Sequence, residues 1–132
     1  MDALDGLQTR FVIEGGRRLE GVVDAPGAKN AALPIMAASI LAEGEVVLHH
    51  VPRITDVDVM IALLENLGAR VREQPGGTLV IDTSSISSNA APYALVSRLN
   101  ASFDVAGPLL GRFRRAEVPQ PGGCVLGPRA ID

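Results

Sequence analysis

Cys124 is the residue of this sequence best suited to covalent or proton-transfer chemistry. It is the only cysteine, it follows Pro121, Gly122 and Gly123, and Arg129 lies shortly downstream. A cysteine that serves packing usually lies in an apolar helix or strand, whereas two glycines allow the backbone to turn sharply and approach a ligand. A thiol needs a positive environment to ionise or deliver a proton near neutral pH, and Arg129 is placed to supply one. A buried or idle loop cysteine is the alternative interpretation.

Lys29 is the second candidate, because it stands where a helix is predicted to begin. Apolar residues predict a helix over 31–42, with Asn30 as its N-cap and Pro34 within its first turn, where backbone N–H groups have no helical partner. The start of a helix carries partial positive charge and free N–H donors. Lys29 at this point predicts a contact with phosphate or carboxylate, and a merely solvated lysine is the alternative.

The remaining polar clusters have sufficient structural explanations. His49 and His50 end a predicted strand over 45–50 and are assigned no chemistry. Asp56 and Asp58 lie in the first turn of a predicted helix, where the helix dipole favours acidic residues. The arginines of 112–115 are interpreted as a solvated helix end.

Composition narrows the classes of function. The chain has 132 residues, of which 47% are hydrophobic and 20% charged, and its net charge of -3 gives no basic excess for nucleic acid or acidic membranes. Aromatic residues make up only 3%, which disfavours a base-stacking surface. One cysteine excludes an internal disulfide framework and fits a reducing compartment. The single cysteine and the two adjacent histidines together make a poor set of metal ligands, so no metal site is predicted. No cofactor is predicted either.

No targeting or spanning segment is predicted. The first ten residues lack the basic-then-apolar pattern of a secretion signal. The longest apolar run, residues 31–42, contains Pro34 and Ser39 and is too short to cross a bilayer.

The elements that must position these residues follow from periodicity and turn signals. Strands are predicted at 10–13, 19–23, 45–50, 69–73, 78–82 and 116–118, and helices at 31–42, 55–67 and 92–105. Residues 74–77 are predicted to form the turn that joins the strands at 69–73 and 78–82 into a hairpin. The first two strands would form a small hairpin that cannot stand alone. The alternation of helices and strands predicts an α/β domain with helices packed on a small sheet.

Local signals set the predicted ends of the helices. Thr55 is predicted as an N-cap with Asp58 three residues on, a variant of the capping box, and Gly68 closes that helix. Pro92 fits the first position of the third helix. The pair at 107–108, glycine then proline, is predicted to kink or break it.

Five motifs occur in one order: Gly-Ala-Lys-Asn-Ala-Ala-Leu-Pro at 27–34, Val-Pro-Arg with Asp-Val-Asp at 51–58, Ala-Pro-Tyr at 91–93, Gly-Pro-Leu at 107–109 and Pro-Gly-Gly-Cys at 121–124. Together they closely resemble the UDP-N-acetylglucosamine enolpyruvyl transferases (1-carboxyvinyltransferases), an EPSP synthase-like family, from about Phe11 to Asp132. The resemblance implies an α/β fold of repeated β-α-β-α-β-β units, an inside-out α/β barrel, truncated here to an N-terminal fragment. Residues 1–9 would be a leader, 10–26 a hairpin and crossing that pack on the missing second domain, and 27–132 the N-terminal part of the transferase domain.

The resemblance also implies an activity. The family moves the enolpyruvyl group of phosphoenolpyruvate onto the 3-hydroxyl of UDP-N-acetylglucosamine and releases phosphate. This is the first committed step of peptidoglycan precursor synthesis, hence of cell-wall biogenesis, cell shape and division, and takes place in the cytoplasm. The implied partners are the two small-molecule substrates, with self-association or a complementing C-terminal portion, and neither nucleic acid nor membrane.

The family's site residues carry over by position. Lys29 and Asn30 match the pair that contacts phosphoenolpyruvate. Cys124 matches a mobile-loop cysteine that donates a proton, forms an adduct with phosphoenolpyruvate and is alkylated by fosfomycin. Arg129 matches an arginine of the active site, here assigned to the nucleotide sugar. The segment that begins with Ala130, Ile131 and Asp132 matches the one that touches the uridine nucleotide.

Two residues depart from the family pattern. Asn100, counted among the nucleotide-sugar contacts, stands where the family usually has arginine, and it keeps hydrogen bonding but loses the charge that strengthens anion binding. Asp104 stands where the family has an apolar or aromatic residue. A carboxylate there would repel substrate phosphates or disturb helix packing.

Three alternatives remain. The chain is expected to be inactive in isolation, either as a truncated remnant or as a binding module of the family. The sibling enolpyruvyl transferase of the shikimate pathway shares the fold, but its members lack the cysteine loop. A purely structural or interaction module would fold stably without any response to ligands. The resemblance implies that the first hairpin packs on a second domain. Without that domain its apolar surface would be exposed, which predicts aggregation, self-association or partial disorder of the isolated chain.

Overall fold

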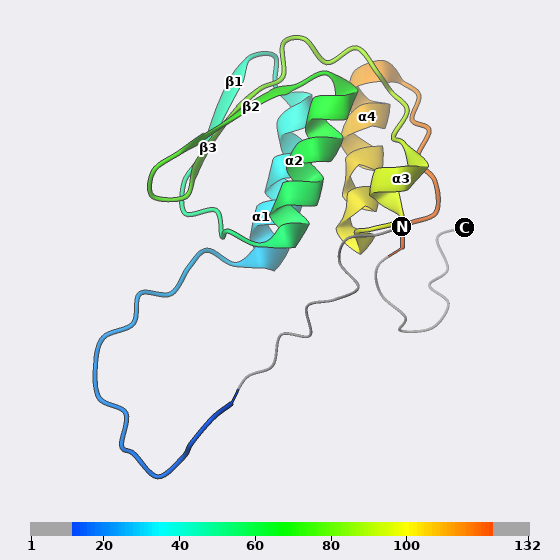
Figure 1. Ribbon diagram of the computed structural model, residues 1–132. Coiled ribbons are helices and arrows are strands. Elements are labelled where there is room, and N and C mark those ends of the chain that lie inside the picture. Colours follow the sequence, from blue (N-terminus) through cyan, green and yellow to red (C-terminus); the bar gives the residue numbers. More distant parts are fainter. Residues whose placement is uncertain (1–11, 123–132) are drawn as a thin grey trace.

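The structure is a computed structural model that describes residues 12–122. A three-stranded sheet lies on one side of the long helices α1 and α2, and the shorter helices α3 and α4 lie on the other side (Figure 1). This arrangement confirms the predicted α/β domain with helices packed on a small sheet.

The sheet consists of β1 (Glu45–Leu48), β2 (Arg70–Gln74) and β3 (Thr78–Asp82), in the order β1-β3-β2 with antiparallel pairing throughout. The predicted hairpin of 69–73 and 78–82 is therefore confirmed, with Gln74 opposite Thr78. β1 ends at Leu48, earlier than predicted. His50 has a φ of 57°, a left-handed conformation that cannot continue a strand.

Helix α1 (Lys29–Ala38) continues into a 3₁₀ turn, η1 (Ser39–Leu41), and begins earlier than predicted. Ala28 is the N-cap, and its backbone carbonyl accepts the N–H groups of Ala31 and Ala32 at 3.1 and 2.9 Å. The predicted capping role of Asn30 is wrong, because Asn30 already lies inside the helix. Pro34 accordingly falls beyond the first turn, and its missing N–H leaves one helical hydrogen bond unmade.

Helix α2 (Thr55–Leu67) has Ile54, not Thr55, as its N-cap, and no side chain caps it. The predicted capping box is wrong, since the backbone carbonyl of Ile54 accepts the N–H of Val57 at 2.9 Å. The predicted end is confirmed: Gly68 has a φ of 109° and donates its N–H to Glu65 at 3.0 Å. The buried face includes Val57, Leu64 and Leu67, which recur at helical spacing.

The predicted third helix is divided into α3 (Tyr93–Val96), the 3₁₀ turn η2 (Asn100–Val105) and α4 (Ala106–Phe113). The break comes before Asn100, where the buried Ser102 hydroxyl donates to the carbonyls of Val96, at 3.0 Å, and Leu99. The break predicted at Pro108 is wrong. Pro108 lies in the first turn of α4, where a backbone N–H would have no helical partner.

Two predicted strand regions are also wrong. Residues 12–28 form neither helix nor strand, and Leu19 and Val22 are each 95% exposed. A two-stranded hairpin is marginal unless its apolar face is covered, and nothing in the described residues covers it. The predicted strand at 116–118 is reduced to a single parallel bridge between Ala90 and Glu117.

The core lies where α1 and α2 meet the sheet and the 93–113 region. Its fully buried large side chains come from every layer: Met36, Ile40, Met60, Leu63, Leu64, Leu67, Ile81 and Leu109. This core fixes the two long helices against each other. Within residues 12–122 no helix has the length and apolarity needed to cross a membrane.

Candidate anion-binding site

Lys29 is the first residue of α1, and its side chain is paired with α2. The Nζ atom lies 2.8 Å from Oδ2 of Asp56, the second residue of α2, and donates a hydrogen bond to it. The N-terminal ends of the two helices therefore lie next to each other, bridged by an ion pair. A helix dipole disfavours a cation at the N-terminus and favours an anion there, so the Asp56 carboxylate offsets the unfavourable position of Lys29.

Gly27 brings the start of α1 close to the end of β1. A Cβ atom on Gly27 would lie 1.7 Å from the carbonyl oxygen of His50, so only glycine fits there. After the left-handed turn at His50, Val51 donates its N–H to the carbonyl of Gly77 at 2.8 Å. These contacts direct the segment before α2 along the start of α1, which places Asp56 beside Lys29.

Asn30 follows Lys29 in the first turn of α1, and both residues are exposed. Together they present an ammonium group, an amide side chain and the N–H groups of a helix start. These are hydrogen-bond donors suited to a phosphate or carboxylate. Among residues 12–122, no cluster of three or more His, Cys, Asp or Glu is arranged to hold a metal ion.

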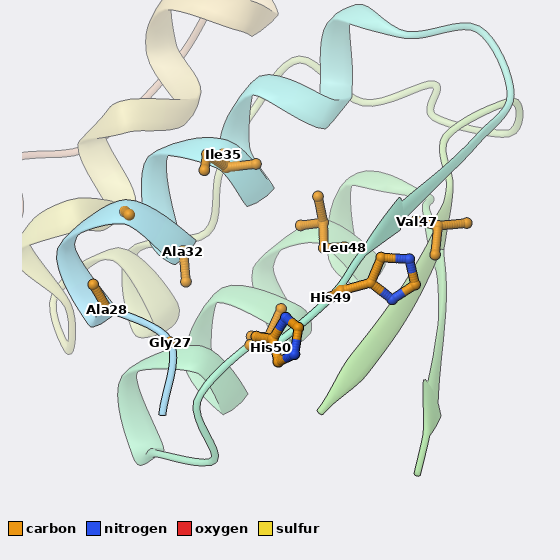
Figure 2. A pocket seen from close by; sticks show the side chains of 10 residues that line it. Gly27, Ala28, Ala32, Ile35, Val47, Leu48, His49 and His50 are labelled. Atoms are coloured by element: carbon orange, nitrogen blue, oxygen red, sulfur yellow. The ribbon is translucent and has the colours of Figure 1, made fainter. Parts of the chain in front are cut away.

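A separate hollow of about 250 Å³ opens between α1 and β1 (Figure 2). Its lining is mostly aliphatic, with Ile35 of α1 facing Val47 and Leu48 of β1, and it also includes His49 and His50. Lys29 and Asn30 are not among its lining residues. His49 Nδ1 lies 3.1 Å from the hydroxyl of Thr78, which fits the interpretation that assigned the histidines no chemistry.

Asn100 and Asp104 both lie on η2, which packs against α1. Asn100 is half-buried and Asp104 is exposed. Partial desolvation raises the pKa of Asp104 above its ordinary value of 3.8. Asn100, where the resemblance implies an arginine, thus lies on an element in direct contact with the helix of Lys29.

Cys124, Arg129, Ala130, Ile131 and Asp132 lie outside the described residues. The structure does describe the approach to the cysteine loop. Gly122 donates its N–H to the carbonyl of Val96 at 3.3 Å, and a Cβ atom there would lie 1.9 Å from the carbonyl oxygen of Ser97. At Gly122 the backbone therefore lies close to the end of α3, whereas the predicted approach of the cysteine loop to a ligand stays a prediction.

The arginines of 112–115 divide into two kinds. Arg114 and Arg115 are exposed, as a solvated helix end requires. Arg112 is half-buried, and its Nη1 donates to the carbonyls of Ile40 and Ala42 at 3.0 and 3.2 Å. The solvated interpretation is wrong for Arg112, which ties α4 to the end of η1.

Sequence reasoning missed the partner of Lys29. Asp56 lies 27 residues from Lys29 in the sequence, and its place at the start of α2 had a sufficient explanation in the helix dipole. No local pattern shows that the two helix starts meet. The motif containing Asp56 did belong to the ordered set that carried the family resemblance.

Comparisons with known proteins agree with one another. Residues 13–132 match the family model described as EPSP synthase (3-phosphoshikimate 1-carboxyvinyltransferase). The UDP-N-acetylglucosamine 1-carboxyvinyltransferase of Desulfatibacillum aliphaticivorans is 49% identical over 123 residues, which are 93% of this chain and 29% of that protein. The protein of the same name from Dichelobacter nodosus is 48% identical over 120 residues, 91% of this chain and 29% of that protein.

A solved structure shows the same similarity in three dimensions. The crystal structure of the enolpyruvyl transferase NikO from Streptomyces tendae matches with a TM-score of 0.67 and 27% sequence identity. The match covers 74% of this chain and 23% of that one. The chain thus spans under a third of the length of these relatives.

Proposed function

The chain belongs to the EPSP synthase family of carboxyvinyltransferases, and we propose that it is the N-terminal portion of a UDP-N-acetylglucosamine 1-carboxyvinyltransferase. The predicted family and fold class are confirmed by the family match and by the solved enolpyruvyl transferase. The proposed reaction transfers the enolpyruvyl group of phosphoenolpyruvate to the 3-hydroxyl of UDP-N-acetylglucosamine and releases phosphate.

One observation carries the choice of substrate. Relatives that are 48% and 49% identical over more than nine-tenths of the chain bear the name of the UDP-N-acetylglucosamine enzyme. The Pro-Gly-Gly-Cys motif at 121–124 supports the same choice, because the shikimate-pathway sibling is expected to lack this loop. The proposal places the activity in peptidoglycan precursor synthesis in the cytoplasm.

The chemistry assigns a role to each part of the site. Addition across the enol double bond needs a proton at the methylene carbon and cationic partners for the phosphate and carboxylate of phosphoenolpyruvate. Cys124 supplies the proton in this proposal, and Lys29 and Asn30 hold the anion. Arg129 and the segment beginning at 130–132 contact the nucleotide sugar.

The domain organisation is part of the proposal. Residues 27–132 form the beginning of the transferase domain, and residues 10–26 pack on a second domain that a longer relative contains. The exposure of Val12, Ile13, Leu19, Val22 and Val23 supports this, because apolar side chains at 77–95% exposure lack the cover that a domain normally gives them.

A chain without turnover is the second candidate. It is favoured by Asn100, which lacks the charge of the arginine that the resemblance implies. On this reading the chain retains anion or nucleotide-sugar contacts but cannot complete the reaction alone.

Alkylation by fosfomycin tests the proposed site. The chain has one cysteine, so intact-mass spectrometry gives an unambiguous product. We expect a single adduct that is absent from Cys124→Ala and that forms more slowly when phosphoenolpyruvate and UDP-N-acetylglucosamine are both present. Shikimate 3-phosphate in place of the nucleotide sugar should give no added protection. An adduct whose formation ignores both substrates would contradict the site.

A further inference from the structure

We infer that Asp56 is a positioning residue, which holds the Lys29 ammonium group in the place where an anionic substrate is bound. The inference deepens the proposed function, because it rests on the proposed contact between Lys29 and phosphoenolpyruvate. It concerns a residue to which sequence analysis gave only a helix-dipole role.

The geometry is that of a direct, oriented contact. Asp56 Oδ2 accepts from Lys29 Nζ at 2.8 Å, and the two side chains remain 35% and 51% exposed. The Asp56 carboxylate thus holds the ammonium group, while half of the lysine side chain is exposed to solvent. A lysine side chain that is already restrained loses less conformational freedom when it binds an anion, which favours binding.

Stability alone is a weak explanation of this pair. Exposed ion pairs contribute little to folding, and Lys29 lies at the end of α1 that disfavours a cation. Asp58 shows that α2 does not depend on Asp56 for an acidic first turn, because Asp58 lies in the same turn. Within the described residues Asp58 is exposed and makes no ion pair.

Removal of the Asp56 carboxylate tests the inference, because a positioning role and a purely electrostatic role predict opposite changes in anion binding. A carboxylate next to an anion site repels the anion, so its removal should tighten binding if charge were its only effect. If Asp56 positions Lys29, its removal should weaken binding instead. Asp58, which carries the same charge in the same helical turn but forms no ion pair among residues 12–122, supplies the matched control.

Lys29 is the only lysine in the sequence, so lysine labelled with ¹³C at Cε and ¹⁵N at Nζ gives one Cε–Nζ signal. NMR relaxation of this signal reports the mobility of the ammonium group, and titration with phosphoenolpyruvate reports binding. The series comprises the unaltered chain, Asp56→Asn, Asp56→Glu, Asp58→Asn and Lys29→Met. Amide spectra of each variant verify that the fold is retained.

We expect Asp56→Asn to increase the mobility of the Lys29 signal and to weaken phosphoenolpyruvate binding by up to about fivefold, the equivalent of the upper range for an exposed pair. Asp56→Glu should recover part of both effects. Asp58→Asn should leave the mobility unchanged and binding equal or slightly tighter.

Unchanged mobility in Asp56→Asn, or binding that stays equal or becomes tighter, would overturn the inference while the Lys29 contact stands. The Lys29 contact itself fails if the unaltered chain does not bind phosphoenolpyruvate, or if Lys29→Met, followed by amide signals, binds it equally well. That result would overturn the inference together with the proposed role of Lys29.

Discussion

At the scale of single residues, the site combines a cation and an anion at two helix starts. Lys29 could be identified from sequence because a helix start and a lysine are both visible locally. Its pairing with Asp56 could not, because it depends on the close approach of Gly27 to His50 and on the turn that follows. The identity of a candidate residue was therefore predictable, whereas its electrostatic partner needed the tertiary structure.

The Asp104 carboxylate destabilises the folded chain at neutral pH, and a single substitution tests this effect. Desolvation raises its pKa above 3.8 in the folded chain, so the folded state binds this proton more tightly than the unfolded state does. The folded state is therefore penalised as the pH rises through 3.8 towards the folded pKa, and the penalty is complete at neutral pH. We expect Asp104→Asn to raise the melting temperature at pH 7 and to leave it unchanged at pH 3.

Asp82 provides the control of opposite sign. Hydrogen bonds from the side chain and backbone of Ser84 lower the pKa of Asp82, so its stabilising effect is present above the ordinary pKa and is lost as the pH falls. Asp82→Asn should lower the melting temperature at pH 7 and lose this effect in acid. Parallel shifts of both variants at neutral pH would contradict the two assignments.

At the scale of secondary structure, Arg112 joins α4 to the end of η1. Its guanidinium donates to two backbone carbonyls, and the cation also lies 5.5 Å from the centre of the Phe113 ring. Because hydrogen bonds from charged donors are among the stronger ones, we expect Arg112→Ala to lower the free energy of unfolding by about 1–3 kcal/mol. Urea denaturation followed by circular dichroism measures the difference.

Arg115→Ala is the matched control for that measurement. Arg115 is exposed and pairs only with the nearby Glu117 among the described residues, and such surface pairs contribute from zero to about 1 kcal/mol. Equal destabilisation by the two substitutions would show that Arg112 does not tie α4 to η1.

The helices and strands differ in how far the sequence predicts them. The β2–β3 hairpin and the end of α2 at Gly68 follow from local turn chemistry, and both were predicted correctly. The region 92–113 was not, because the apolar pattern alone does not show that the Ser102 hydroxyl turns inward and donates to the carbonyls of Val96 and Leu99. Buried polar contacts of this kind decide where a helix breaks, and they become visible only in the packed structure.

At the scale of the whole molecule, residues 12–26 are the least integrated part of the described chain. Their large apolar side chains are exposed, and in the proposed function this surface packs on a second domain. The alternation that predicted a hairpin there gives no stable hairpin without a surface to pack on. This error is informative, because it indicates a segment whose structure depends on another part of the protein.

Removal of this segment should separate folding from association. A chain that starts at Pro26 is expected to melt at nearly the same temperature as the full chain, since the described part of the deleted segment, residues 12–25, contributes nothing to the core. It should also self-associate less, because exposed apolar surface has been removed. Sedimentation velocity and thermal melts test both expectations. A large drop in melting temperature would mean that the deleted segment, residues 1–25, stabilises the core.

Phosphate release tests most directly whether this chain supplies one part of an enolpyruvyl transferase site. The chain would be mixed with UDP-N-acetylglucosamine, phosphoenolpyruvate and the portion of the Desulfatibacillum aliphaticivorans relative that follows its matched segment, with Cys124→Ala as control. We predict Cys124-dependent release in the complete mixture and none from the chain alone. Release by the chain alone would contradict its assignment as a partial site. No release from the complete mixture, even after Asn100→Arg, would contradict the transferase function.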